Sequence, residues 1–68
     1  MTIKEIVEKC GRKHGGVVFD PNDRYMYVVN KRSQTIKTYL MGIHFNYFLG
    51  KYNYTLKELE NHNSLKLS

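Results

Sequence analysis

The chain has 68 residues, enough for one domain near the lower limit of what folds without a partner, a metal or disulfides. Its single cysteine excludes an internal disulfide, and no apolar stretch approaches the roughly 18 residues of a membrane span. The start of the sequence lacks the hydrophobic segment of a signal peptide, so we expect a cytoplasmic protein without membrane contact. The net charge of +5 favours an anionic partner.

The first predicted element is a helix from Thr2 to Cys10. Thr2 is an N-cap residue and Glu5 follows three residues later, which is the pattern of a capping box. Apolar residues recur at helical spacing up to Cys10, and Gly11 stands where glycine commonly ends a helix. Because Cys10 falls on the apolar face of this helix, we expect it to pack in the core rather than act as a nucleophile.

Three strands are predicted next, at residues 17–20, 25–30 and 35–41. Each is rich in β-branched or aromatic residues, which favour strands. Two short polar breaks separate them, at residues 20–23 and 31–34. Strands joined by such short links pair as an antiparallel meander.

The stretch 43–49 fits two structures. Its apolar residues fit one face of a buried helix, which is slightly favoured, and their alternation also fits a fourth strand. Beyond it, Thr55 and Glu58 form a second capping-box pattern that opens a short helix through about Asn61. Residues 63–68 are expected to form a frayed tail.

Together these elements predict one α+β domain over residues 1–68. It is a small three-stranded antiparallel meander flanked by an N-terminal helix and one or two C-terminal helices. This order is similar to that of double-stranded RNA-binding domains and of HicA-like ribonuclease toxins. The resemblance is one of topology alone, because the Gly-Ser-His pattern of HicA-like toxins is absent and the predicted helix at Thr55 lacks the basic cluster that RNA-binding domains place there.

No catalytic or metal-binding pattern stands out in the sequence. The cysteine and the three histidines, His14, His44 and His62, lack the paired short spacings of zinc sites. The glycine-rich stretch 11–16 follows a helix and precedes a strand, the reverse of a phosphate-binding loop. We therefore expect a non-enzymatic protein without metal or cofactor. The alternative, a small nuclease with His14 as acid or base, depends on a basic loop alone.

Nucleic-acid binding is one of two binding hypotheses. Cations cluster at residues 9–14 and 31–32, and on a meander both clusters would lie at the same end of the sheet. Tyrosines on the strands among cations are typical of surfaces that hold single strands by base stacking and phosphate neutralisation. Tyr25 and Tyr27 share one face, however, which could equally be core. The candidate binding surface consists of Arg12, Lys13, His14, Arg24, Tyr25, Tyr27, Lys31, Arg32, Lys37 and Tyr39.

Docking on another protein is the function that the sequence favours, since tyrosine and arginine are also preferred anchors of protein interfaces. The composition lacks alanine and is rich in lysine, asparagine, isoleucine and tyrosine, which suggests an AT-rich genome such as that of a phage or mobile element. We expect a small binding protein that docks on a host or cellular protein or complex, with RNA or DNA binding as the alternative. Homo-oligomerisation is a further option, because a core of this size supplies only about 3–5 kcal/mol.

Overall fold

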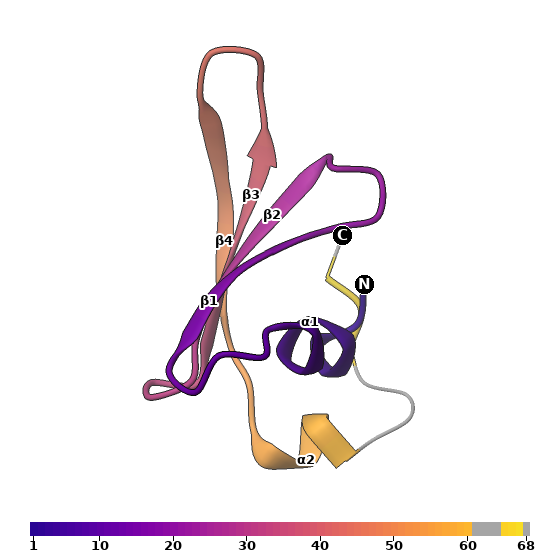
Figure 1. Cartoon of the computed structure of the whole chain (residues 1–68), viewed down its shortest axis with the longest axis vertical. Coiled ribbons are helices and arrows are strands. Elements are labelled where there is room, and N and C mark those ends of the chain that lie inside the picture. The colour runs from indigo at the N-terminus through magenta and orange to yellow at the C-terminus, as the bar shows by residue number, and fades with distance from the viewer. Residues whose placement is uncertain (61–64, 68) are drawn as a thin grey trace.

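The protein is a four-stranded antiparallel sheet with a helix packed on one face (Figure 1). The structure, a computed structural model, describes residues 1–60 and 65–67. The elements are α1 (Ile3–Lys9), β1 (Gly15–Phe19), β2 (Tyr25–Asn30), β3 (Thr35–Met41), β4 (Asn46–Asn53) and α2 (Leu56–Glu60). The strands lie in the order β1-β2-β3-β4, so β1 and β4 are the two edges. The α+β class and the antiparallel meander are confirmed, whereas the expectation of three strands is wrong.

The fourth strand corrects the slight preference for a helix at residues 43–49. The chain turns back at residues 42–45, where the Gly42 N–H donates to the Phe45 carbonyl with an N···O distance of 3.1 Å. A Cβ on Gly42 would lie 2.5 Å from that same oxygen, so the turn requires glycine. Pairing with β3 then satisfies the backbone of β4 on one side, and this long-range pairing outweighs the local helical pattern.

Helix α1 (Ile3–Lys9) has the capping box that its sequence predicts. The Thr2 hydroxyl accepts from the Glu5 N–H at 3.2 Å, and the Glu5 carboxylate accepts from the Thr2 N–H at 3.1 Å, which completes the capping box. The helix ends at Lys9, with Cys10 as its C-cap residue. Cys10 is a buried free thiol, only 5% exposed, as its place on the apolar face predicts.

The core lies between α1 and one face of the sheet. It consists of Ile3, Ile6, Val7, Cys10, Val18, Tyr27, Val29, Ile36 and Tyr54. Tyr27 is completely buried, and its hydroxyl donates to the Leu67 carbonyl at 3.0 Å. The Tyr27 side chain therefore connects the core to the C-terminal segment.

The C-terminal residues 65–67 run beside the start of α1. The Ile3 N–H donates to the Leu65 carbonyl and the Leu67 N–H donates to the Met1 carbonyl, both at 2.9 Å. These contacts correct the expectation of a frayed tail for residues 65–67; the other residues of that predicted tail lie outside the described residues.

Helix α2 follows the end of β4 and is short. Its predicted end, Asn61, lies outside the described residues. The Glu58 N–H donates to the Thr55 carbonyl at 3.0 Å, while the Glu58 carboxylate accepts from the Leu65 N–H at 3.2 Å. Glu58 therefore joins α2 to the C-terminal segment rather than closing the predicted capping box.

Candidate functional site

One face of the sheet is covered by α1 and the other, which we call the open face, is not (Figure 1). Cross-strand partners on one face stand side by side, so the register of the strands arranges the open face in rows. The aromatic row consists of Phe19, Met26, Tyr39 and Phe48. The lysine row, next toward the β2–β3 turn, consists of Val17, Val28, Lys37 and Lys51. The polar row at that end consists of Asn30, Thr35 and Asn53.

The aromatic row presents flat apolar surface to solvent. Phe19 is 45% and Phe48 57% exposed, although both are large apolar side chains. The rings of Tyr39 and Phe48 meet edge to face, with centroids 5.4 Å apart and an interplanar angle of 62°. A cluster of exposed aromatic residues on a sheet is typical of a surface that receives a ligand rather than of a solvated one.

The lysine row contains a pair of like charges without an anion. Lys37 and Lys51 are direct cross-strand partners on β3 and β4, and both are exposed. Like charges opposite each other destabilise a sheet. Neither lysine makes a hydrogen bond or ion pair with another residue in the described part of the chain. A pocket of about 280 Å³ lies beside them, lined by Val28, Asn30, Ser33, Thr35, Lys37 and Lys51. An anion bound here would relieve the repulsion.

The two basic segments that flank β1 and β2 meet at one end of the sheet, as the sequence predicts, except for Lys9, whose ammonium group donates to the Phe19 carbonyl at the other end of β1. Because Gly15 pairs with Asn30, His14 lies beside Lys31, whose N–H donates to the His14 carbonyl at 3.0 Å. The Arg32 Nε–H donates to His14 Nδ1 at 3.2 Å, so the ring nitrogen acts as an acceptor. We call the group Arg12, Lys13, His14, Lys31 and Arg32 the basic end.

Lys31 differs from the other cations of the basic end because it is part of the fold. Its ammonium group donates to the carbonyl of Cys10, the C-cap residue of α1, and its side chain is partly buried. A cation at a helix C-terminus is favourable both as a hydrogen-bond donor and through the helix dipole. Lys31 thus fastens α1 to the β2–β3 turn, and a change of its charge would disturb the structure as well as any ligand.

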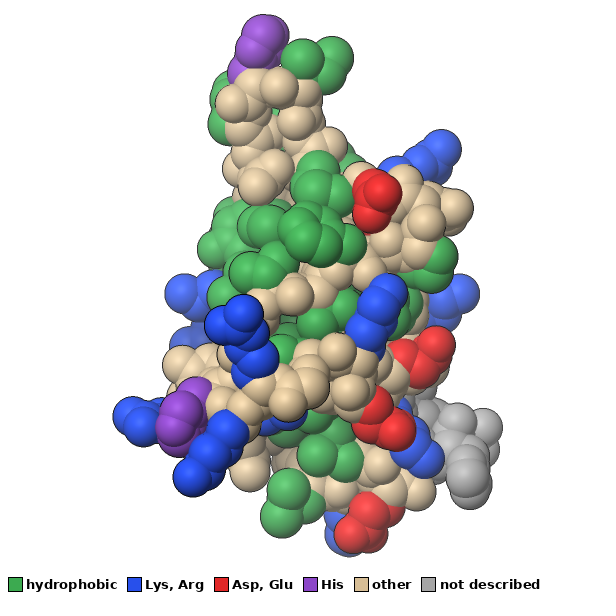
Figure 2. Space-filling view, in the orientation of Figure 1, with side chains coloured by type: hydrophobic (Ala, Val, Ile, Leu, Met, Phe, Trp, Pro, Cys, Tyr) green, Lys and Arg blue, Asp and Glu red, His purple; other side chains and the backbone are tan. Residues whose placement is uncertain are grey.

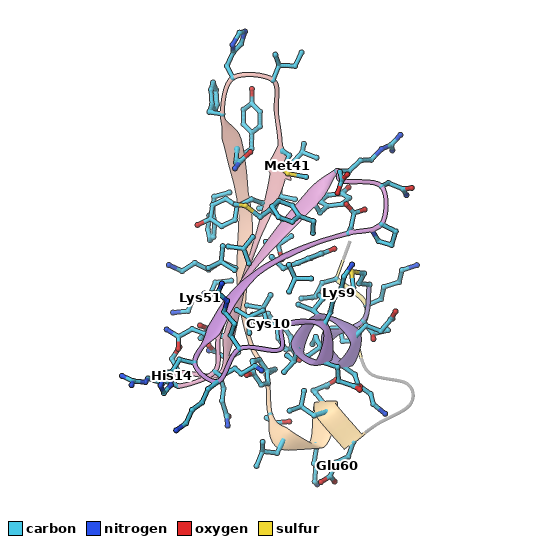
Figure 3. All side chains as sticks on the ribbon, viewed as in Figure 1. Lys9, Cys10, His14, Met41, Lys51 and Glu60 are labelled. Carbon is cyan, nitrogen blue, oxygen red and sulfur yellow. The ribbon has the colours of Figure 1, made fainter. Side chains whose placement is uncertain are left out.

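The acidic residues are confined to one side of the molecule, whereas Lys and Arg side chains occur on both sides. All acidic residues lie on α1, on α2 or in the β1–β2 turn: Glu5, Glu8, Asp20, Asp23, Glu58 and Glu60. Figure 2 shows Lys and Arg side chains gathered around a histidine at the lower left, while the acidic side chains lie on the right. In Figure 3, His14 and Lys51 lie toward the left of the view, away from α1, whereas Cys10 lies between the strands and α1. No acidic side chain therefore belongs to the open face.

The acidic β1–β2 turn is structured by its own carboxylate. The Asp20 carboxylate accepts from the Arg24 N–H at 2.6 Å and from the Tyr25 N–H at 3.0 Å. Hydrogen bonds from the Tyr25 and Arg24 N–H groups hold the pKa of Asp20 below its ordinary value. This turn lies at the end of the sheet opposite the basic end.

The structure separates the predicted binding residues into groups. Arg12, Lys13, His14, Lys31 and Arg32 are brought together at the basic end, and Lys37 and Tyr39 lie on the open face. Arg24 lies apart, at the other end of the sheet, where its carbonyl accepts from the Met41 N–H. Tyr25 is half-buried against the core, and Tyr27 is wholly buried, which is a correction of its assignment to a binding surface.

Three residues of the open face were missed by the sequence analysis: Phe19, Phe48 and Lys51. Both Phe48 and Lys51 belong to β4; Phe48 falls in the stretch 43–49, which the sequence leaves ambiguous between helix and strand, and Lys51 follows that stretch. Phe19 alternates with the buried Val18 on β1, and that period of two could have placed it on the uncovered side.

The described residues contain no group of three or more His, Cys, Asp or Glu side chains that could hold a metal ion. His62, one of the three histidines considered as zinc ligands, lies outside those residues. Cys10 is buried at the C-terminal end of α1.

Comparison with protein-family models, with curated proteins and with solved structures gives no match to this chain. Among residues 1–60 and 65–67, no helix has the length and apolarity to cross a membrane.

Proposed function

We propose that this protein binds single-stranded nucleic acid across the open face of its sheet. The observation that carries the proposal is the cross-strand pair of Lys37 and Lys51 in the lysine row, which no anionic side chain of the described residues neutralises. This pair lies between the aromatic row and the cations of the basic end. Single strands are held by the same combination, in which bases stack on aromatic side chains and cations neutralise phosphates.

The spacing of the rows suits a nucleotide. Neighbouring residues on one face of a strand are about 6.6 Å apart. Lys37 and Tyr39 are such neighbours on β3, and Phe48 lies beside Tyr39. A base stacked on these rings would leave its phosphate within reach of the long side chain of Lys37. The nucleic-acid chain would then continue over the lysine row toward the basic end. Absence of carboxylates from this path removes the main source of repulsion for a polyanion.

The proposal predicts a definite dependence on salt. Each neutralised phosphate of a single strand contributes about −0.7 to the slope of log K against log salt concentration. With Lys37, Lys51, Arg12 and Arg32 engaged, the slope is expected to be about −3.

Fluorescence anisotropy with labelled mixed-sequence DNA and RNA oligonucleotides tests the proposal. The double variant Lys37→Gln, Lys51→Gln should bind at least ~10-fold more weakly, and its salt slope should be shallower by about 1.4. The control Arg24→Gln, Lys57→Gln has the same net charge, and its two exposed positions lie away from the open face. Equal losses in both variants, or no binding by the unaltered protein, would refute the proposal.

Docking on another protein, the function that the sequence favours, is a second proposal. The β3–β4 hairpin supports it, because that hairpin exposes large apolar side chains that a nucleic acid on the open face would leave uncovered. A pull-down from lysate that returns only background would count against a heterologous protein partner.

A further inference from the structure

The tip of the β3–β4 hairpin extends beyond the end of β2 (Figure 1). We define the arm as residues 38–50, which are this tip and the adjoining parts of β3 and β4. Ile43 at its tip is 97% exposed, an extreme value for an aliphatic residue. Side chains on both faces of the arm are also uncovered, and the exposed apolar set comprises Leu40, Ile43, Phe45, Tyr47, Phe48 and Leu49. The rings of Phe45 and Tyr47 pack together with centroids 4.6 Å apart, so part of the arm surface is preformed.

The arm contains no Asp, Glu, Lys or Arg, although the whole chain carries a net charge of +5. At a net charge of +5 per chain, the average electrostatic interaction between two copies is repulsive. They can approach arm to arm without bringing two cations together. The arm is thus the part of the surface that is best suited to a second copy, whereas the lysine row and the basic end are suited to an anion.

The outer edge of the arm is an unprotected strand. Within residues 1–60 and 65–67, β4 pairs only with β3, so peptide groups along its other side have no strand partner there. Edge strands that avoid association carry charges, proline or a covering segment. From Asn46 to Gly50, β4 has neither charge nor proline. The opposite edge, β1, is shorter, and the ammonium group of Lys9 donates to its Phe19 carbonyl at 3.2 Å.

We infer that a second copy of this chain pairs antiparallel with β4, so that the two arms lie side by side in one continuous sheet. A two-fold axis perpendicular to the sheet generates such a pair and places the helices of both copies on the same face. With the axis near Phe48, Lys51 and the partner's Lys51 are six strand positions apart, about 20 Å. The lysine rows of the two copies therefore do not collide.

The exposed apolar side chains of the arm set an upper limit to the area that the dimer can bury. With roughly 200 Å² for a fully exposed large side chain, the six apolar side chains of the arm expose on the order of 700 Å² per copy. Edge pairing covers only the part of this surface that lies along the two β4 strands, together with their unpaired peptide groups. The open faces of the two copies, Phe48 included, stay accessible and form one surface, and the dimer does not depend on nucleic-acid binding.

Sedimentation equilibrium over a wide range of protein concentration tests the inference. The unaltered protein should reach twice its chain mass of 8.1 kDa. Leu49→Lys and Ile43→Lys should each shift the dimer dissociation constant upward by at least ~10-fold, because each places a cation in the apolar interface. The control Val17→Lys changes a residue of similar exposure, 51% against 53% for Leu49, at the other edge of the sheet, and should remain dimeric.

Two results would overturn the inference. One is an unaltered protein that stays monomeric up to about 1 mM, the weak limit of specific association. The other is a dimer whose dissociation constant is unchanged in both arm variants, which would place the interface elsewhere. Circular dichroism identifies unfolded variants, and Ile43→Lys is the safer of the two because its site makes almost no contact with the fold. Oligonucleotide binding by Ile43→Lys at saturating concentration separates this inference from the proposed function.

Discussion

Lys31 and Lys37 have the same side chain but different roles, and replacing each by methionine separates them. Methionine keeps the apolar stem and removes the ammonium group. In Lys31→Met the Cys10 carbonyl loses its donor at the end of α1. A hydrogen bond from a charged group is worth about 1.5–3 kcal/mol, which partial exposure reduces, so we expect a loss of about 1–2 kcal/mol. For a domain of this size, that lowers Tm by roughly 4–16 °C.

Lys37→Met should behave in the opposite way. The Lys37 side chain is exposed on the open face, so its stability should stay within about 0.5 kcal/mol of the unaltered protein, while oligonucleotide binding weakens. Urea unfolding followed by circular dichroism gives the two stabilities, and anisotropy gives the two affinities. If both variants unfold at the same urea concentration, Lys31 does not fasten α1 and the assignment of the two roles is wrong.

Three further predictions concern the fold. Tyr27→Phe removes the hydroxyl that donates to the Leu67 carbonyl and should cost about 1 kcal/mol in urea unfolding. Gly15→Ala should destabilise the protein by about 1–3 kcal/mol, because the φ of Gly15 is +121° and an added Cβ would lie 2.0 Å from a carbonyl oxygen of β2. The control Gly11→Ala should leave the stability unchanged, because the space around Gly11 is open. Main-chain N–H donors lower the pKa of Asp20 below its ordinary 3.8, so its contribution to stability is present above about pH 4 and is lost as pH falls further. Asp20→Asn should therefore flatten the acid part of the stability profile, and an unchanged profile would contradict this.

Local signals in the sequence were sufficient for α1 and for the first three strands. The capping box of Thr2 and Glu5 and the polar turns are decided within a few residues, so the sequence alone predicts them. The meeting of the two basic segments could also be predicted, because consecutive antiparallel strands bring His14 and Lys31 to one end.

The sequence predicts the helix and the strands more reliably than it predicts the face of the sheet on which each residue lies. Tyr27 and Tyr39 have the same propensity for strands, yet one is buried under α1 and the other lies on the open face. That choice depends on which face the helix covers, a long-range property. Phe48 and Lys51 were missed for a related reason, since a β-bulge between β3 and β4 disturbs the alternation that would have placed them.

The most direct test of nucleic-acid binding by the open face is a titration of isotope-labelled protein with a short single-stranded oligonucleotide, followed by amide and side-chain chemical shifts. The account predicts that the largest changes occur at Tyr39, Phe48, Lys37 and Lys51 and at the basic end, with α1 and α2 nearly unchanged. Changes centred on the helices, or no changes at saturating oligonucleotide, would contradict it.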